Sequence, residues 1–182
     1  MKTYISTLRA INVGGQKLIK MDALRKLYEN MGFQDVRTYV QSGNVVFKGG
    51  DIELFSLEKS IGQQIKTDFD FEVPVIVLTV DLLNQVITNN PFLADPSKEH
   101  SFLHLTFLAS KPKVYDKEAI ESKKEGGEAI RFSDKVIYLY CPNGYGRSKL
   151  TNNLIEARLK VKATTRNWKT VNELLKISQQ TF

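Results

Sequence analysis

The sequence predicts an α+β protein built from two similar halves. Short apolar runs with strand-like alternation are separated by segments whose apolar residues recur at helical spacing. The order of these strands and helices occurs twice along the 182 residues. A hydrophobic content of 42% with 25% charged residues is typical of a chain with a packed core rather than of a disordered one.

The first half, residues 1–80, follows the order strand, helix, strand, strand, helix, strand. Its predicted strands are residues 4–11, 36–40, 45–47 and 73–80. Its helices carry apolar stripes at Met21, Leu24, Leu27, Tyr28 and Met31, and at Leu54, Leu57, Ile61 and Ile65. Asp51 is placed to cap the second helix, and residues 41–44 supply the glycine and asparagine of a hairpin turn.

A linker with a short helix, residues 81–101, leads to the second half, residues 102–182. The predicted strands here are 102–109, 129–132 and 136–140, and the predicted helices are 115–124 and 148–159. A fourth strand is reduced to the short basic segment 160–163, so this half is expected to be degenerate. Thr164 or Thr165 is expected to cap an extra C-terminal helix. The order β-α-β-β-α-β is the ferredoxin-like arrangement.

The net charge of +6 is unevenly placed along the chain. Residues 1–146 carry 18 basic and 18 acidic groups, whereas residues 147–182 carry eight basic groups and only Glu156 and Glu173 as acidic ones. A basic segment of this kind attracts polyanions. A solvated, lysine-rich helix pair is the competing interpretation.

The segment with the strongest chemical signal is residues 141–149, Cys-Pro-Asn-Gly-Tyr-Gly-Arg-Ser-Lys. A glycine-rich turn from a strand into a helix exposes backbone N–H groups, and the helix dipole adds partial positive charge. We therefore predict an anion-binding site made of Asn143, Gly144, Gly146, Arg147, Ser148 and Lys149. Its candidate extensions are Arg166, Lys169 and the turn residues Asn12 and Asn44.

The same segment supports a second interpretation, a cysteine phosphatase of the Cys-x5-Arg-Ser type. Cys141 would be the nucleophile, Arg147 would bind the phosphate, and Ser148 would ease departure of the thiolate. Against this, Pro142 lacks an N–H at the first loop position, and Tyr140 stands where such enzymes typically have a histidine. We therefore assign no catalytic residue and favour a buried, structural cysteine.

Nucleic acid is one candidate for the anionic ligand. Ferredoxin-like sheets bind single strands when aromatic side chains on central strands stack on bases. Tyr138 and Tyr140 share a strand face, and Tyr145 and Trp168 lie in adjoining segments. However, neither half shows the aromatic-rich signature of an RNA-recognition module, and strand tyrosines are more often half-buried packing residues.

Other function classes lack support in the sequence. His100 and His104 lie four residues apart, but no carboxylate or cysteine spacing completes a metal site. The chain has no Walker loop, nucleophile-elbow serine or dinucleotide fingerprint. We expect no metal and no cofactor. The N-terminus does not resemble a signal peptide, no apolar run is long enough to cross a membrane, and a single cysteine suits a reducing compartment, so we expect a cytoplasmic protein.

Five motifs occur in an order that resembles a known family. They are Leu8-Arg-Ala-Ile-Asn-Val-Gly-Gly15, Thr38-Tyr-Val-Gln-Ser-Gly-Asn-Val-Val-Phe47, Asn90-Pro-Phe92, Pro142-Asn-Gly-Tyr-Gly-Arg-Ser-Lys-Leu150 and Thr164-Thr-Arg-Asn-Trp168. Together they resemble the uncharacterised bacterial family known as domain of unknown function 1697. Ala10 stands where that family usually has glycine. The resemblance implies paired ferredoxin-like units and supplies no activity, so the expected function is a non-catalytic binder of a phosphate-bearing ligand.

Overall fold

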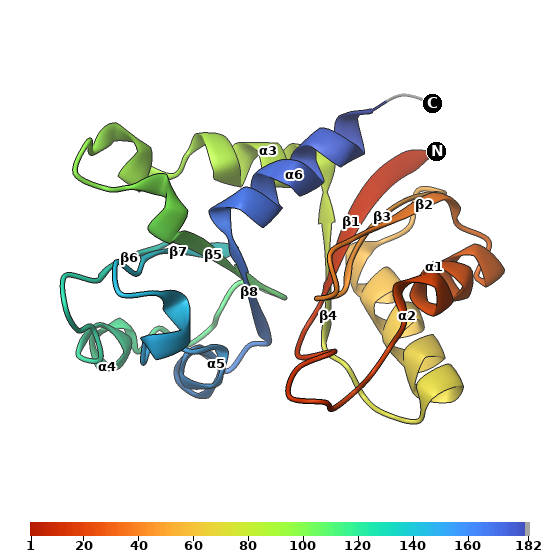
Figure 1. Ribbon diagram of the computed structural model, residues 1–182, viewed down its shortest axis with the longest axis horizontal. Coiled ribbons are helices and arrows are strands. Elements are labelled where there is room, and N and C mark those ends of the chain that lie inside the picture. The colour runs from red at the N-terminus through yellow and green to blue at the C-terminus, as the bar shows by residue number, and fades with distance from the viewer. Residues whose placement is uncertain (181–182) are drawn as a thin grey trace. The chain divides into compact units, whose positions relative to one another are not determined.

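Four strands form the first of two antiparallel sheets in the computed structural model, which describes residues 1–180 (Figure 1). The strands are β1 (Lys2–Leu8), β2 (Gln34–Tyr39), β3 (Asn44–Gly49) and β4 (Val75–Thr79). They are ordered β2-β3-β1-β4, which is the strand order of a ferredoxin-like unit. The hairpin between β2 and β3 begins with the pair Tyr39 and Asn44, at the turn that the sequence predicts.

Two helices cover one face of this sheet, α1 (Met21–Asn30) and α2 (Leu54–Phe69). Their apolar stripes meet the alternate side chains of the strands, and Tyr4, Tyr28, Phe33 and Phe47 form a set of ring contacts at the centre of the core. The predicted cap is wrong: Asp51 pairs with Lys2 at 2.7 Å, and Glu53 precedes α2 without a side-chain cap.

The second sheet repeats the first. Its strands are β5 (Leu103–Leu108), β6 (Ala129–Phe132), β7 (Val136–Tyr140) and β8 (Ala163–Asn167), in the order β6-β7-β5-β8. Helices α4 (Lys117–Glu121) and α5 (Asn152–Leu159) pack on one face around Ile120, Ile155 and Leu159. The protein is therefore an α+β protein with two ferredoxin-like units.

The fourth strand of the second half is complete, which corrects the expectation of a degenerate half. β8 pairs antiparallel with β5 from Leu108 and Ala163 to His104 and Asn167. It begins at Ala163, the last residue of the predicted segment 160–163, and it contains the two threonines that were expected to cap the last helix. The strand Ala-Thr-Thr-Arg-Asn lacks an alternating apolar pattern, and it forms because it adds a full ladder of backbone hydrogen bonds to β5.

The remaining elements connect or extend the two sheets. They are helix α3 (Val80–Thr88), the 3-10 turns η1 (Pro91–Ala94), η2 (His100–Phe102) and η3 (Tyr145–Arg147), and the C-terminal helix α6 (Trp168–Gln179). The chain divides into two compact units. The first contains Met1–Asn84 together with the residues from Glu173 onward, and the second contains Gln85–Asn172.

Two loops of the first unit hold several residues in the left-handed backbone region. Ala10, Asn12 and Lys17 have φ values of 58°, 55° and 47°, and Val40 has 50°. The loops are joined because Asn12 Nδ2 donates to the carbonyls of Ile19 and Gln41, at 2.9 and 2.8 Å. A left-handed conformation is unfavourable for alanine and more so for a β-branched residue.

Candidate anion-binding site

The predicted site lies at one end of the second sheet. Leu103 pairs with Tyr140 and His104 pairs with Asn167, so the start of β5 and the ends of β7 and β8 meet there. The glycine-rich segment 141–149 continues directly from β7. The backbone amide of Cys141 donates to the carbonyl of Phe102 at 3.0 Å, which extends the strand pairing by one residue into the loop.

The loop is a tight 3-10 turn rather than the start of a long helix. Gly144 has φ +88°, a conformation that favours glycine, and η3 follows it. Helix α5 begins only at Asn152, where the Thr151 hydroxyl accepts from the amide of Leu154 at 3.2 Å. The predicted helix start at Ser148 is therefore wrong by four residues, and the dipole of α5 does not act on the glycines themselves.

Backbone amides in the turn are partly used. Those of Gly144, Arg147 and Ser148 donate to the carbonyls of Cys141, Gly144 and Tyr145 at 3.0, 3.2 and 3.0 Å. Within residues 1–180, the amides of Gly146 and Lys149 have no such partner. The amide of Asn143 likewise has no such partner among the described residues, so the loop retains backbone donors that an anion can bind.

The two cations of the loop differ in their surroundings. Arg147 is exposed, and its guanidinium has neither an ion pair nor a hydrogen bond within the described chain. Lys149 instead forms an ion pair with Glu125. Asn143 is also used internally, since its Nδ2 donates to the carbonyl of Gly126 at 3.2 Å. Arg147 is therefore the group that the loop offers to an anion.

Cys141 does not have the environment of a nucleophile. Its side chain is fully buried in the core formed with Leu139, Leu150 and Ile155. Burial, with a smaller contribution from the charge of Glu128, raises the pKa of the Cys141 thiol to about 11. A phosphatase of this type needs an accessible thiolate, so the geometry disfavours that interpretation.

A cluster of polar side chains that the sequence analysis did not identify lies beside the loop. Thr165 is its centre: its hydroxyl is 2.7 Å from Thr106 Oγ1, 2.7 Å from Asn152 Oδ1 and 3.2 Å from the hydroxyl of Tyr145. The ring of Tyr145 stacks on His104 with centroids 5.0 Å apart and planes at 26°. The members come from four separate segments, and only the strand register brings them together.

The four predicted extensions have different positions. Lys169 is exposed in the first turn of α6 and Arg166 lies on β8, at the same end of the sheet as the loop. Burial lowers the pKa of Arg166 to about 10, which still leaves it charged at neutral pH, and its Nη1 donates to the carbonyl of Thr165 at 3.0 Å. Asn12 and Asn44 belong to the first unit, where the Asn12 amide donates to the carbonyls of Ile19 and Gln41 and the Asn44 amide donates to that of Tyr39.

The two tyrosines that suggested a base-stacking sheet face are covered. Tyr138 and Tyr140 are 5% and 8% exposed. The hydroxyl of Tyr138 donates to the carbonyl of Val86 at 3.0 Å, and the Tyr140 ring contacts Phe92 of η1. Stacking of bases on this face, as in RNA-recognition modules, is therefore not available to the protein in this structure.

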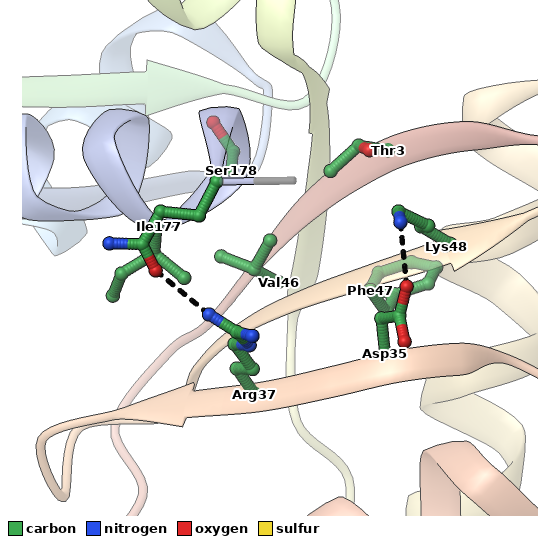
Figure 2. Close-up of a pocket in the computed structure, with 9 residues that line it drawn as sticks. Thr3, Asp35, Arg37, Val46, Phe47, Lys48, Ile177 and Ser178 are labelled. Carbon is green, nitrogen blue, oxygen red and sulfur yellow. Dashed lines mark hydrogen bonds and ion pairs between the residues drawn. The ribbon is translucent and has the colours of Figure 1, made fainter. Parts of the chain in front are cut away.

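A shallow recess lies in the first unit, beside the end of α6 (Figure 2). It encloses about 230 Å³, including open solvent at its mouth. Its cations are engaged: Lys48 pairs with Asp35 at 2.6 Å, and Arg37 donates to the side chain of Gln180 at 2.8 Å. These contacts make it a weaker candidate for an anion than the Arg147 loop.

Within residues 1–180, no three histidine, cysteine, aspartate or glutamate side chains are grouped so as to hold a metal ion. In the same part of the chain, no helix has the length and apolar character needed to cross a membrane.

Fold and sequence together define the class of this chain: an α+β protein of two ferredoxin-like units. It belongs to the family described as "Protein of unknown function (DUF1697)", which it matches over residues 1–138. The match confirms the family suggested by the five motifs, and it ends before the glycine-rich loop.

One solved structure shows how far the likeness extends. The conserved bacterial protein SP0830 from Streptococcus pneumoniae is similar with a TM-score of 0.72 and 21% sequence identity, over 98% of this chain and 99% of that chain. At this identity the likeness shows the fold alone. No curated protein matches the sequence.

Proposed function

We propose that this protein is cytoplasmic and is a non-catalytic binder of a phosphate-bearing ligand, with Arg147 as the principal phosphate contact. The observation that carries the proposal is the state of Arg147. It is an exposed guanidinium without a partner in the described chain, on a loop whose backbone is fixed by three internal hydrogen bonds. A guanidinium binds phosphate oxygens with two parallel hydrogen bonds, and because the backbone is already ordered, only the Arg147 side chain loses conformational freedom on binding.

The charge of the second unit supports the same proposal. Gln85–Asn172 carries 15 basic and nine acidic side chains, whereas the rest of the chain carries eleven of each. The whole net charge of +6 therefore belongs to the unit that contains Arg147. A positive field around the loop favours capture of anions and makes binding depend on salt.

The test is a titration of the wild type and of Arg147→Ala with inorganic phosphate and with a labelled single-stranded oligonucleotide. Loss of a charged hydrogen-bond donor is expected to weaken binding about tenfold. Arg158→Ala is the matched control, because Arg158 is also exposed and in the second unit but pairs with Asp116 at 3.4 Å. It is expected to change the affinity less than twofold.

Two outcomes would contradict the proposal. One is an absence of binding to either probe by the wild type at low salt. The other is an equal loss of affinity in Arg147→Ala and Arg158→Ala, which would indicate attraction to overall charge and no site. Lys149→Ala is expected to have an intermediate effect, since Lys149 is paired with Glu125. Oligonucleotide affinity is expected to fall steeply as salt is raised.

A further inference from the structure

The polar cluster beside Arg147 has a defined direction of hydrogen bonding. In the amide orientation of the structure, Asn152 Oδ1 is only an acceptor, so the Thr165 hydroxyl donates to it at 2.7 Å. The oxygen of Thr165 then accepts from Thr106 at 2.7 Å and from Tyr145 at 3.2 Å. The single proton and both lone pairs of Thr165 are thereby used.

This network fixes the ring of Tyr145. The ring is held at its hydroxyl by Thr165 and on one face by His104, so its position needs no further ordering when a ligand arrives. Both Tyr145 and His104 remain partly exposed. A rigid, partly exposed aromatic pair is a suitable platform for a flat ring, because little entropy is lost on stacking.

His104 offers the ligand an acceptor rather than a charge. Its Nδ1 lies 3.2 Å from the carbonyl of Phe102, so this nitrogen carries the proton and Nε2 carries a lone pair. Burial lowers the pKa of His104, which keeps the ring neutral at pH 7. Within residues 1–180, neither His104 Nε2 nor Asn152 Nδ2 has a hydrogen-bond partner.

The Arg147 guanidinium, a donor, and the neutral His104 ring, an acceptor, suit different parts of a ligand. A phosphate at neutral pH presents mostly acceptor oxygens, which suit the Arg147 guanidinium and are poor partners for a lone pair on His104. The edge of a nucleobase presents both N–H donors and acceptors around a flat ring. A molecule with a phosphate at one end and a base at the other satisfies both parts of the site.

We infer that the phosphate-bearing ligand of this site is a nucleotide, whose base stacks on the Tyr145–His104 pair while its phosphate contacts Arg147. The inference rests on the proposed phosphate contact of Arg147, and it specifies the other part of the ligand as a nucleobase. A free mononucleotide and the terminal nucleotide of a nucleic acid share this chemistry.

The experiment compares four probes on the wild type: AMP, ribose 5-phosphate, inorganic phosphate and a single-stranded oligoadenylate with a terminal phosphate. AMP is expected to bind at least tenfold more tightly than ribose 5-phosphate, since stacking of a base contributes about that factor or more. Similar affinities for AMP and the oligonucleotide would assign the site to a free mononucleotide. A stronger, salt-dependent affinity for the oligonucleotide would assign it to a nucleic-acid end.

Two variants and one spectroscopic signal isolate the stacking. Tyr145→Leu is expected to remove the preference for AMP and to leave ribose 5-phosphate binding within twofold, whereas Tyr145→Phe keeps the ring and most of the preference. In the wild type, the imidazole proton signals of His104 are expected to shift with AMP and not with ribose 5-phosphate. This signal decides the matter even if Tyr145→Leu fails to fold.

Equal affinity for AMP and ribose 5-phosphate, with no specific shift at His104, would overturn the nucleotide inference and leave the phosphate proposal standing. Binding of neither probe would overturn both. An AMP preference that survives Arg147→Ala unchanged would retain the stacking platform and refute the phosphate contact.

Discussion

Cys141 shows how the surroundings of one residue decide between two interpretations of a motif. The spacing Cys-x5-Arg-Ser is compatible with a phosphate-binding nucleophile, but the side chain is fully buried and the pKa of its thiol is raised to about 11. Relative to an ordinary cysteine, the thiolate fraction at pH 8 is lower by roughly a hundredfold. The residue therefore behaves as a small apolar side chain of the core.

We expect Cys141 to react slowly with alkylating reagents in the folded protein. Iodoacetamide labelling at pH 8, followed by mass spectrometry, is expected to be at least a hundredfold slower than in guanidinium-unfolded protein, since the thiol is both protonated and inaccessible. Labelling at equal rates would contradict the assignment, as would hydrolysis of an aryl phosphate that Cys141→Ser abolishes.

Ala10 is a second residue whose backbone determines its effect. It has φ 58°, a left-handed conformation that favours glycine, so its Cβ adds strain. We expect Ala10→Gly to stabilise the protein by about 0.5–1 kcal/mol, because relief of strain exceeds the entropy that glycine adds to the unfolded chain. Urea unfolding measures the difference in the free energy of unfolding.

The control for this substitution is Ala157→Gly. Ala157 is exposed inside helix α5, and glycine there is expected to destabilise the protein by about 1 kcal/mol. Changes of the same sign in both variants would show that the left-handed conformation of Ala10 costs nothing.

At the scale of elements, helix α5 illustrates which face of a helix meets a core. Ile155 and Leu159 are fully buried, whereas Leu154 is only partly buried at the edge of the same cluster. The sequence predicts a helix start at Ser148, but α5 begins at Asn152. The orientation of α5 about its own axis therefore could not be derived from the spacing of apolar residues alone.

Paired substitutions test this rotation. Ile155→Ala is expected to lower the free energy of unfolding by about 3 kcal/mol, because it leaves a cavity in the core. Leu154→Ala is expected to cost about 1 kcal/mol, as a partly exposed side chain loses less burial. Chemical denaturation of both variants gives the two values, and equal losses would contradict the packing of α5.

Most strands and helices were predictable because their apolar periodicity is strong. Leu24, Leu27 and Ile61 are buried as their stripes predict. β8 was misplaced because its residues, Ala-Thr-Thr-Arg-Asn, lack that periodicity, and only pairing with β5 makes them a strand. Local sequence does not contain this tertiary information.

The candidate site was predictable only in part. The glycines and Arg147 could be recognised within nine consecutive residues, and the structure leaves Arg147 exposed. The sequence could not predict the ion pair of Lys149 with Glu125 or the cluster around Thr165. The residues that form these contacts are 13 to 59 positions apart in the chain. The one signal available was the tyrosine between the two glycines, whose role depends on strand register.

At the scale of the whole molecule, the charge divides according to the compact units. The unit Gln85–Asn172 carries all of the excess positive charge, and the other unit is neutral. Because screening at moderate salt limits the reach of a surface charge to about 10 Å, charges near the Arg147 loop should dominate the capture of anions.

Two charge-matched double variants test this division. Lys124→Gln with Lys169→Gln removes two exposed cations of the second unit on the side of the loop, since Lys124 precedes the Glu125 partner of Lys149 and Lys169 follows the end of β8. Lys26→Gln with Lys59→Gln removes two from the first unit. We expect the former to weaken oligonucleotide binding several-fold at low salt and to flatten its salt dependence, and the latter to change it less than twofold. Fluorescence anisotropy measures both, and equal losses would refute the division.

The discontinuity of the first unit has a consequence for biosynthesis. Its sheet is made from residues 1–84, but Ile177 and Ser178 of α6, which lie beside Thr3 and Val46, come from its second segment. During translation, the whole of Gln85–Asn172 must be synthesised before this segment is made. The nascent first sheet therefore spends the synthesis of 88 residues without α6, at roughly 5–20 residues per second, a window of several seconds in which a chaperone has an apolar surface to bind.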